Sequence, residues 1–239
     1  MRILVFQHLA CEHPGTFREF MGDDDHATHT VELDAGEAIP DLDDFDALMI
    51  MGGPMDVWQK ETHPWLKAEI AAIRDWVAIR RRPFLGFCLG HQLLAEALGG
   101  RVEAAGEAEI GVLSVELTEA GKSSAFLENL PHKMACFQWH SAEVTRPPDG
   151  AEILASSPAC TVNAMSWGPL AFSIQFHVEI TPTTVAEWGA VPEYARALEA
   201  ALGRDGIPLL DEKASARMAD FKANSRQLYE NFMAVARTA

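Results

Sequence analysis

An apolar run that ends in a Gly-x-Cys-x-Gly turn constrains this chain more than any other feature. Residues 83–92 read Pro-Phe-Leu-Gly-Phe-Cys-Leu-Gly-His-Gln, which predicts a buried strand, a sharp turn and the start of a helix. Such a turn holds Cys88 in a strained backbone conformation, and flanking glycines let neighbouring backbone pass close by. The positive end of the helix favours the thiolate, the reactive form of cysteine. Cys88 is therefore predicted to be a nucleophile rather than a structural core cysteine.

The first hundred residues alternate short apolar runs with longer amphipathic segments, a pattern typical of parallel strands covered by helices. Strands are predicted over residues 2–7, 47–51 and 84–87. Residues 64–79 are predicted to be helical, because their apolar side chains recur at intervals of three and four. The expected fold class is α/β, with a mostly parallel central sheet.

Beyond residue 100 the chain changes to closely spaced strands with turn signals between them, which indicates added β-hairpins. These strands are predicted over residues 111–118, 133–139, 152–156, 161–167 and 170–177. From Thr181 onward the chain is predicted to be helical, with Pro182 in a first turn and Gly203 at a helix end. We therefore expect a catalytic domain over 1–180 and a helical extension over 181–239 that packs on it.

The last helical segment carries an apolar stripe, which is more typical of core packing than of a partner surface. The stripe consists of Met218, Phe221, Leu228, Phe232 and Val235.

Charge and composition narrow the function classes. The chain has 19 Lys and Arg against 35 Asp and Glu, a formal net charge of -16, which opposes binding to nucleic acid or to an anionic membrane. The acidic clusters at 23–25 and 41–46 are interpreted as solvated surface, without a metal. No run of about 18 apolar residues is present, and the first residues are read as a strand rather than a signal peptide. Four widely separated cysteines suit a reducing compartment, so we expect a soluble, cytoplasmic protein with a small-molecule substrate.

Cysteine chemistry needs a base and, usually, a group that orients the base. His177 follows an apolar run, and Glu179 stands two residues later, on the same side of an extended chain. A carboxylate there would fix the imidazole tautomer and stabilise the imidazolium. We predict a triad of Cys88, His177 and Glu179.

An acyl-transfer site also needs N–H donors for the developing oxyanion. The backbone of Leu89, directly after the nucleophile, supplies one. The second is predicted in Gly52-Gly53-Pro54, which follows a core strand. Since proline has no N–H, the donor must be Gly53 or Gly52.

With these three segments the chain resembles the class I glutamine amidotransferase superfamily, whose members carry a Gly-Gly-Pro loop, a Gly-x-Cys-x-Gly-x-Gln turn and a His-x-Glu in this order. The resemblance covers roughly residues 1–180 and is closest to stand-alone, GMP-synthetase-like members. It implies a flavodoxin-like three-layer fold. It also implies Cys88 as nucleophile, His177 as base and then acid, Glu179 as orienting group, Gly53 and Leu89 as oxyanion donors, and Gln92 as a substrate-binding residue.

By resemblance, Cys88 would attack the γ-carboxamide of glutamine or of another γ-glutamyl amide, and water would hydrolyse the glutamyl thioester to glutamate. No cofactor is implied. Because the chain shows no Gly-rich, Lys-containing phosphate loop, the ammonia would pass to a separate synthetase subunit, or hydrolysis itself would be the purpose.

The sequence departs from the family pattern at a few positions. Val178 stands where proline is often found, and Met55-Asp56 follows the Gly-Gly-Pro where a small hydroxyl residue is common. His140 lies where relatives place a Ser-His pair in the reverse order, so it is either a substrate contact or a structural residue.

Three other functions remain open from the sequence. One is a γ-glutamyl peptidase that cleaves glutathione-like conjugates. Another is a non-catalytic regulatory or binding subunit of a synthetase. The third is the related superfamily of cysteine proteins that pair a similar turn with an upstream Glu, although the His177-x-Glu179 pair counts against it.

Overall fold

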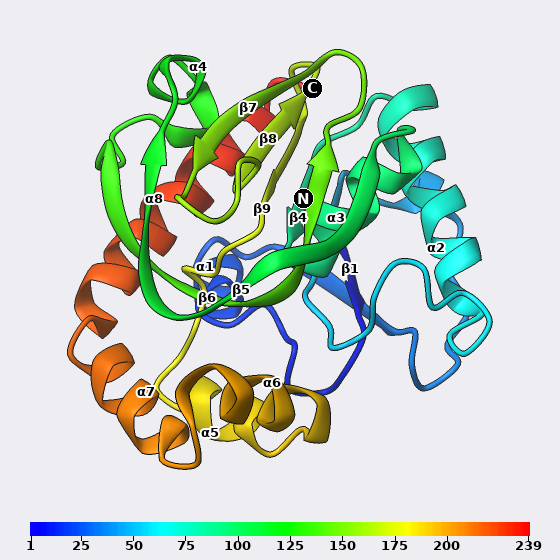
Figure 1. Ribbon diagram of the computed structural model, residues 1–239. Coiled ribbons are helices and arrows are strands. Elements are labelled where there is room, and N and C mark those ends of the chain that lie inside the picture. Colours follow the sequence, from blue (N-terminus) through cyan, green and yellow to red (C-terminus); the bar gives the residue numbers. More distant parts are fainter.

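A computed structural model describes all 239 residues and contains one nine-stranded mixed sheet, in the order β2-β1-β3-β4-β9-β8-β7-β5-β6 (Figure 1). Neighbouring strands are parallel from β2 to β9 and antiparallel from β9 to β6. The parallel strands are β1 (Arg2–Gln7), β2 (Ala27–Glu32), β3 (Ala47–Ile50), β4 (Phe84–Phe87) and β9 (Ala171–Ile174). The others are β5 (Arg101–Leu117), β6 (Lys133–Arg146), β7 (Ala151–Ser156) and β8 (Ala164–Trp167).

Helices cover both faces of the sheet, which gives the three-layer α/β fold expected from the sequence. Figure 1 shows α8 along one side and α2 and α3 along the other, while α5, α6 and α7 group together at one end. The helices are α1 (Phe17–Asp23), α2 (Trp65–Arg74), α3 (Leu89–Ala97), α4 (Glu119–Lys122), α5 (Thr184–Gly189), α6 (Pro192–Leu202), α7 (Gly206–Ser215) and α8 (Met218–Ala236). A π-helical turn, Asp75–Ile79, continues α2, and short 3-10 turns lie at Leu42–Asp44 and Ala125–Leu127.

The central parallel strands are buried on both faces, which is why they read as unbroken apolar runs. All residues of β3 and β4 are buried. One apolar core packs α1 and α8 against the sheet, and a second packs α2 and α3 against the opposite face. The side chains of Phe221, Leu228 and Phe232 on α8 are fully buried, so the interpretation of the C-terminal stripe as core packing is confirmed.

Two elements were not predicted because their sequences lack a strong period. Strand β2 lies at the sheet edge, and only Val31 of its six residues is buried. Helix α1 is only seven residues long, too short to show amphipathic periodicity clearly.

Several predicted boundaries need correction. Strands β5 and β6 are much longer than expected, because they form one long antiparallel ribbon with an irregularity between Ala104 and Glu109. Strand β9 ends at Ile174, so His177 lies beyond it and is held by an isolated antiparallel bridge to Phe137. Pro182 precedes α5 rather than occupying its first turn, since a local turn in which the Thr181 N–H donates to Thr184 Oγ1 comes before the helix. Gly203, with φ of 79°, ends α6 as predicted.

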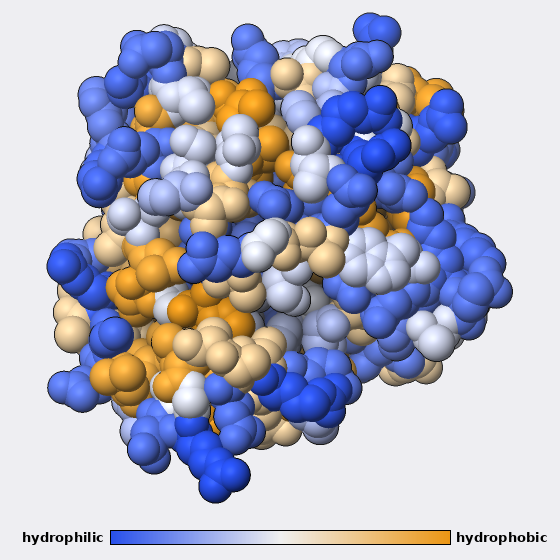
Figure 2. Space-filling model, in the orientation of Figure 1, coloured by the Kyte–Doolittle hydropathy of each residue, from blue (hydrophilic) through white to orange (hydrophobic).

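The surface is mainly polar on the face shown in Figure 2, with apolar side chains gathered over β5, β6 and α7. Leu113 of β5 and Leu209 of α7 are among the exposed large apolar residues. None of the helices combines the length and apolar character that crossing a membrane requires. The division of the chain at residue 180 stays a prediction.

Candidate active site

Cys88 occupies the turn between β4 and α3 in the strained conformation that the sequence predicts. Its φ and ψ are 46° and -99°, and its N–H donates to the Ile174 carbonyl at 2.8 Å. Close packing explains the two flanking glycines: a Cβ on Gly86 would lie 2.7 Å from the Gly90 backbone, and one on Gly90 would lie 2.3 Å from the Ile50 carbonyl oxygen. The strand-turn-helix therefore forms as expected and places the Cys88 thiol at the carboxyl end of the parallel strands.

His177 and Glu179 meet as predicted, although the chain there is no longer a regular strand. His177 Nδ1 lies 2.6 Å from Glu179 Oε1, and the second carboxylate oxygen accepts from the Val178 N–H at 2.9 Å. Burial of the imidazole opposes its protonation, but the Glu179 carboxylate and a side-chain hydrogen bond with Cys88 raise the pKa of His177 well above its usual range. Since Nδ1 faces Glu179, Nε2 is the ring nitrogen left for the thiol.

The two predicted oxyanion donors flank the same thiol. The backbone N–H groups of Gly53 and Leu89 have no backbone acceptor, and Gly53 lines the cavity beside Cys88 whereas Gly52 does not. A Cβ on Gly53 would lie 2.9 Å from Leu89 Cδ2, so the two segments are in close contact. This arrangement supports Gly53 rather than Gly52 as the donor from the loop.

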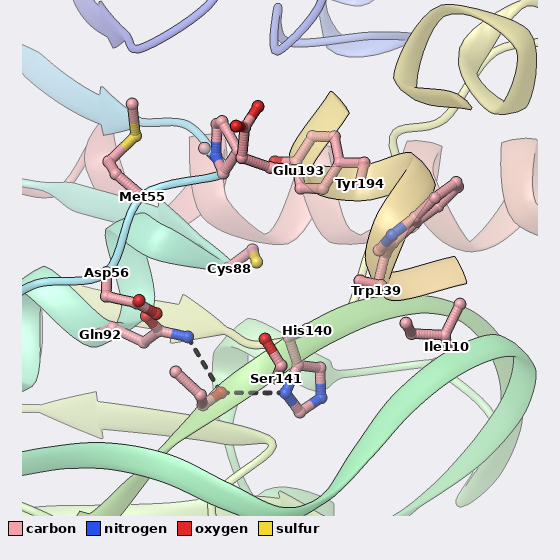
Figure 3. Close-up of a pocket in the computed structure, with 14 residues that line it drawn as sticks. Met55, Asp56, Cys88, Gln92, Ile110, Trp139, His140, Ser141, Glu193 and Tyr194 are labelled. Carbon is pink, nitrogen blue, oxygen red and sulfur yellow. Dashed lines mark hydrogen bonds between the residues drawn. The ribbon is translucent and has the colours of Figure 1, made fainter. Parts of the chain in front are cut away.

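A cavity of about 70 Å³ opens over Cys88 (Figure 3). Gln92 and His140 both line it, and both are fastened to the carbonyl of Ala142. Gln92 Nε2 also donates to Gln175 Oε1 at 3.1 Å, and Gln175 Nε2 in turn donates to Cys88 Sγ at 3.4 Å. Thus Gln92 reaches the cavity, as the resemblance implies, but its amide nitrogen already has protein partners.

His140 belongs to a buried polar cluster as well as to the cavity wall. Its Nε2 lies 3.2 Å from Glu109 Oε2, and Gln138 and Asn163 contact the same carboxylate oxygen. Burial opposes ionisation of Glu109, but hydrogen bonds from His140, Ser157 and Asn163 lower its pKa. His140 therefore combines the two roles that the sequence left open, a cavity wall and a structural contact.

The C-terminal helices cover the triad with residues that sequence analysis did not select. The Trp188 ring of α5 packs edge-on against the His177 ring with centroids 4.7 Å apart, and its Nε1 donates to the Cys11 carbonyl at 3.1 Å. Tyr194 of α6 lines the cavity and donates to Glu12, in the loop after β1. No local motif marks Trp188 or Tyr194, whereas Glu12 could have been suspected because it follows a parallel strand at its carboxyl end.

Glu12 is a buried carboxyl close to the catalytic imidazole. Burial raises its pKa to about 7, although His177 and the Tyr194 hydroxyl favour the ionised form. Its carboxylate packs against Gly52, where an added Cβ would lie 2.5 Å from Glu12 Oε2. No group of three or more His, Cys, Asp or Glu side chains is placed to hold a metal ion.

Glu12 should make stability depend on pH. The folded chain keeps the Glu12 proton up to a pH of about 7, whereas the unfolded chain releases it near the ordinary pKa of 4.5, so stability falls as pH rises between these values. We expect Glu12→Gln to remove up to about 3 kcal/mol of this loss. Urea unfolding at pH 5 and pH 8 measures it; parallel pH curves for the two proteins would contradict the burial cost.

A contact between the loop after β1 and the triad gives a second prediction. The Thr16 N–H donates to the Glu179 carbonyl at 2.7 Å, and Gly15, with φ of +50°, packs so closely that a Cβ would lie 1.8 Å from that oxygen. Gly15→Ala should cost about 4 kcal/mol, from backbone strain and overpacking together. Gly36→Ala is the matched control, because Gly36 also has positive φ but open space around it. Equal losses in urea unfolding would show that Gly15 is not a packing constraint on Glu179.

Comparison with known proteins agrees with this geometry. The family model for glutamine amidotransferase class-I matches residues 24–187. The glutamine amidotransferase-like protein YfeJ of Salmonella typhimurium is 32% identical over 189 residues, which are 77% of this chain and 78% of that protein. One subunit of the glutamine-hydrolysing GMP synthase of Sulfolobus acidocaldarius is 33% identical over 154 residues, 64% of this chain and 77% of that one.

A solved structure extends the likeness to the whole fold. The crystal structure of a glutamine amidotransferase from Thermotoga maritima is 27% identical and superimposes with a TM-score of 0.85 over 97% of both chains, so the match includes the C-terminal helices. The chain belongs to the class I glutamine amidotransferase family.

Proposed function

We propose that this chain hydrolyses the γ-carboxamide of glutamine, with Cys88 as nucleophile, His177 as base and then acid, and Glu179 as orienting group. One observation carries the proposal: the thiol, the imidazole and the carboxylate are linked in that order beside one cavity. This is the arrangement that cysteine acyl transfer needs.

In the first half-reaction, His177 Nε2 takes the thiol proton and Cys88 Sγ attacks the amide carbon. Glu179 stabilises the imidazolium through Nδ1, and the N–H groups of Gly53 and Leu89 stabilise the oxyanion. The imidazolium then gives its proton to the leaving nitrogen, and the C–N bond breaks to release ammonia. In the second half-reaction, His177 removes a proton from water, the hydroxide attacks the thioester, and glutamate leaves as the thiol regains its proton.

The walls of the cavity suit a neutral amide substrate with a polar backbone. Gln92 and His140 present polar side chains, and Trp139 and Ile110 supply apolar contacts. We propose Gln92 as a substrate contact through its carbonyl oxygen, because its amide nitrogen is engaged by Ala142 and Gln175.

The fate of the ammonia is a further part of the proposal. The Sulfolobus acidocaldarius relative carries the name of one part of a glutamine-hydrolysing synthase. We propose that this chain likewise passes ammonia to a separate synthetase subunit.

A specific observation favours the γ-glutamyl peptidase as a second candidate. A larger cavity of about 560 Å³ adjoins the site and shares Pro54, Met55 and Glu193 with it. A bulky amine leaving group on a γ-glutamyl substrate could extend into this space.

The proposal is tested by measuring glutamate release from glutamine and from γ-glutamyl dipeptides by the purified chain. Release from glutamine supports the glutaminase, and a strong preference for the dipeptides supports the peptidase. No release from either substrate, with or without a candidate synthetase, would favour a non-catalytic role.

A further inference from the structure

A second buried pair, distinct from the triad, lies behind the Gly52-Gly53-Pro54 loop. His8 follows β1, and Glu69 projects from α2; both side chains are completely buried. His8 Nε2 lies 2.9 Å from Glu69 Oε1, while His8 Nδ1 lies 2.7 Å from the carbonyl oxygen of Gly52. The His8 ring also stacks on Trp65, with centroids 5.4 Å apart and an interplanar angle of 14°.

The partners of His8 fix where its protons are. A backbone carbonyl oxygen can only accept, so Nδ1 must carry a proton and donate it to Gly52. Nε2 faces a carboxylate, which also accepts, so a proton on each nitrogen satisfies both contacts. Burial opposes this charge, but Glu69, the Gly52 carbonyl and the more distant Glu12 raise the pKa of His8.

The hydrogen bond to Gly52 acts on the oxyanion donor through one rigid unit. The Gly52 carbonyl and the Gly53 N–H belong to the same planar trans peptide, so they point in opposite directions. Fixing the carbonyl toward His8 therefore fixes the N–H on the other side, and Gly53 lines the catalytic cavity beside Cys88. Because both residues are glycine, this peptide could otherwise rotate more freely than in any other sequence.

Stability does not explain why this pair is present. A buried ion pair is commonly no better than apolar side chains of similar volume. Here the cost is greater, since Glu69 Oε2 has no hydrogen-bond partner.

We propose that His8 is a positioning residue that holds the Gly52–Gly53 peptide so that the Gly53 N–H faces the oxyanion, with Glu69 anchoring the His8 ring. This inference rests on the proposed glutamine hydrolysis, to which it assigns two residues that do not touch the substrate.

Two double variants separate the bond to Gly52 from the bond to Glu69. An asparagine amide at position 8 places an N–H donor where Nδ1 stands, whereas a glutamine amide reaches toward the place of Nε2. His8→Asn with Glu69→Gln therefore retains the donor to Gly52, and His8→Gln with Glu69→Gln loses it. Glu69→Gln in both removes an unpaired buried charge. His63→Gln is the control, since His63 also packs on Trp65 but makes no bond to Gly52.

We expect the glutamine variant to lower kcat for glutamine about 10- to 100-fold with little change in KM, because part of one oxyanion donor is lost. The asparagine variant and His63→Gln should stay within about threefold of the parent chain. Alkylation of Cys88 by iodoacetamide should be equal in all of them, because that displacement forms no oxyanion. Equal kcat in the two double variants, or losses that simply follow Tm, would overturn the proposal.

Crystal structures of both double variants keep the inference testable even if the parent chain releases no glutamate, a result that would count against the proposed function alone. The Gly52 carbonyl should keep its direction in the asparagine variant and turn in the glutamine variant. An unchanged peptide in both would show that His8 does not position it.

Discussion

Replacement of Cys88 by alanine is expected to lower glutamine hydrolysis by about 10⁴-fold or more, because no other group at the site can form the thioester. Folding should be preserved. Cys88 is packed at the bottom of a cavity, and its N–H bond to Ile174 involves only the backbone. Initial rates of glutamate release, with circular dichroism of both proteins, measure the two effects.

Cys160→Ala is the matched control for that variant. Cys160 is also a buried free cysteine, but it does not line the catalytic cavity. Activity of the control should remain near that of the parent chain. Turnover that survives in Cys88→Ala at more than a few per cent would mean that another residue is the nucleophile.

Replacement of His177 by asparagine should have a comparable effect, about 10⁴-fold on kcat, because proton transfer to and from the substrate is lost in both half-reactions. The backbone bridge between residue 177 and Phe137 does not depend on the side chain, so the chain should still fold. Steady-state kinetics with glutamine, together with Tm, measure the result. Near-normal kcat would refute His177 as the base.

Glu179→Gln is the companion variant that separates orientation from proton transfer. A glutamine carbonyl can still accept from His177 Nδ1 but cannot stabilise the imidazolium charge, so we expect a loss of about 100-fold. Losses equal to those of His177→Asn would show that Glu179 does more than orient the ring.

The sequence predicted the nucleophile turn and the His177–Glu179 contact because both are written in short, local patterns. The glycines around Cys88 and the two-residue spacing of the pair need no knowledge of distant contacts. The same holds for the central parallel strands, whose burial on both faces leaves continuous apolar runs. The family resemblance was confirmed on the same residues.

The rest of the site depends on contacts between distant segments. Tyr194 reaches Glu12 across 182 positions of sequence, and Trp188 covers His177 from a helix that the sequence placed only approximately. The position of His8 behind the oxyanion loop follows from how β1, β3 and α2 pack together, which no local motif records. Strand β2 was missed for a different reason, since an exposed edge strand need not be apolar.

The most direct test of this account is to mix the purified chain with glutamine, quench with acid within one turnover and measure the mass of the peptide that contains Cys88. The account predicts a γ-glutamyl thioester on Cys88, present in the parent chain and enriched in a variant with slow hydrolysis such as Glu179→Gln. Glutamate release without any adduct on Cys88, or an adduct on another cysteine, would contradict it.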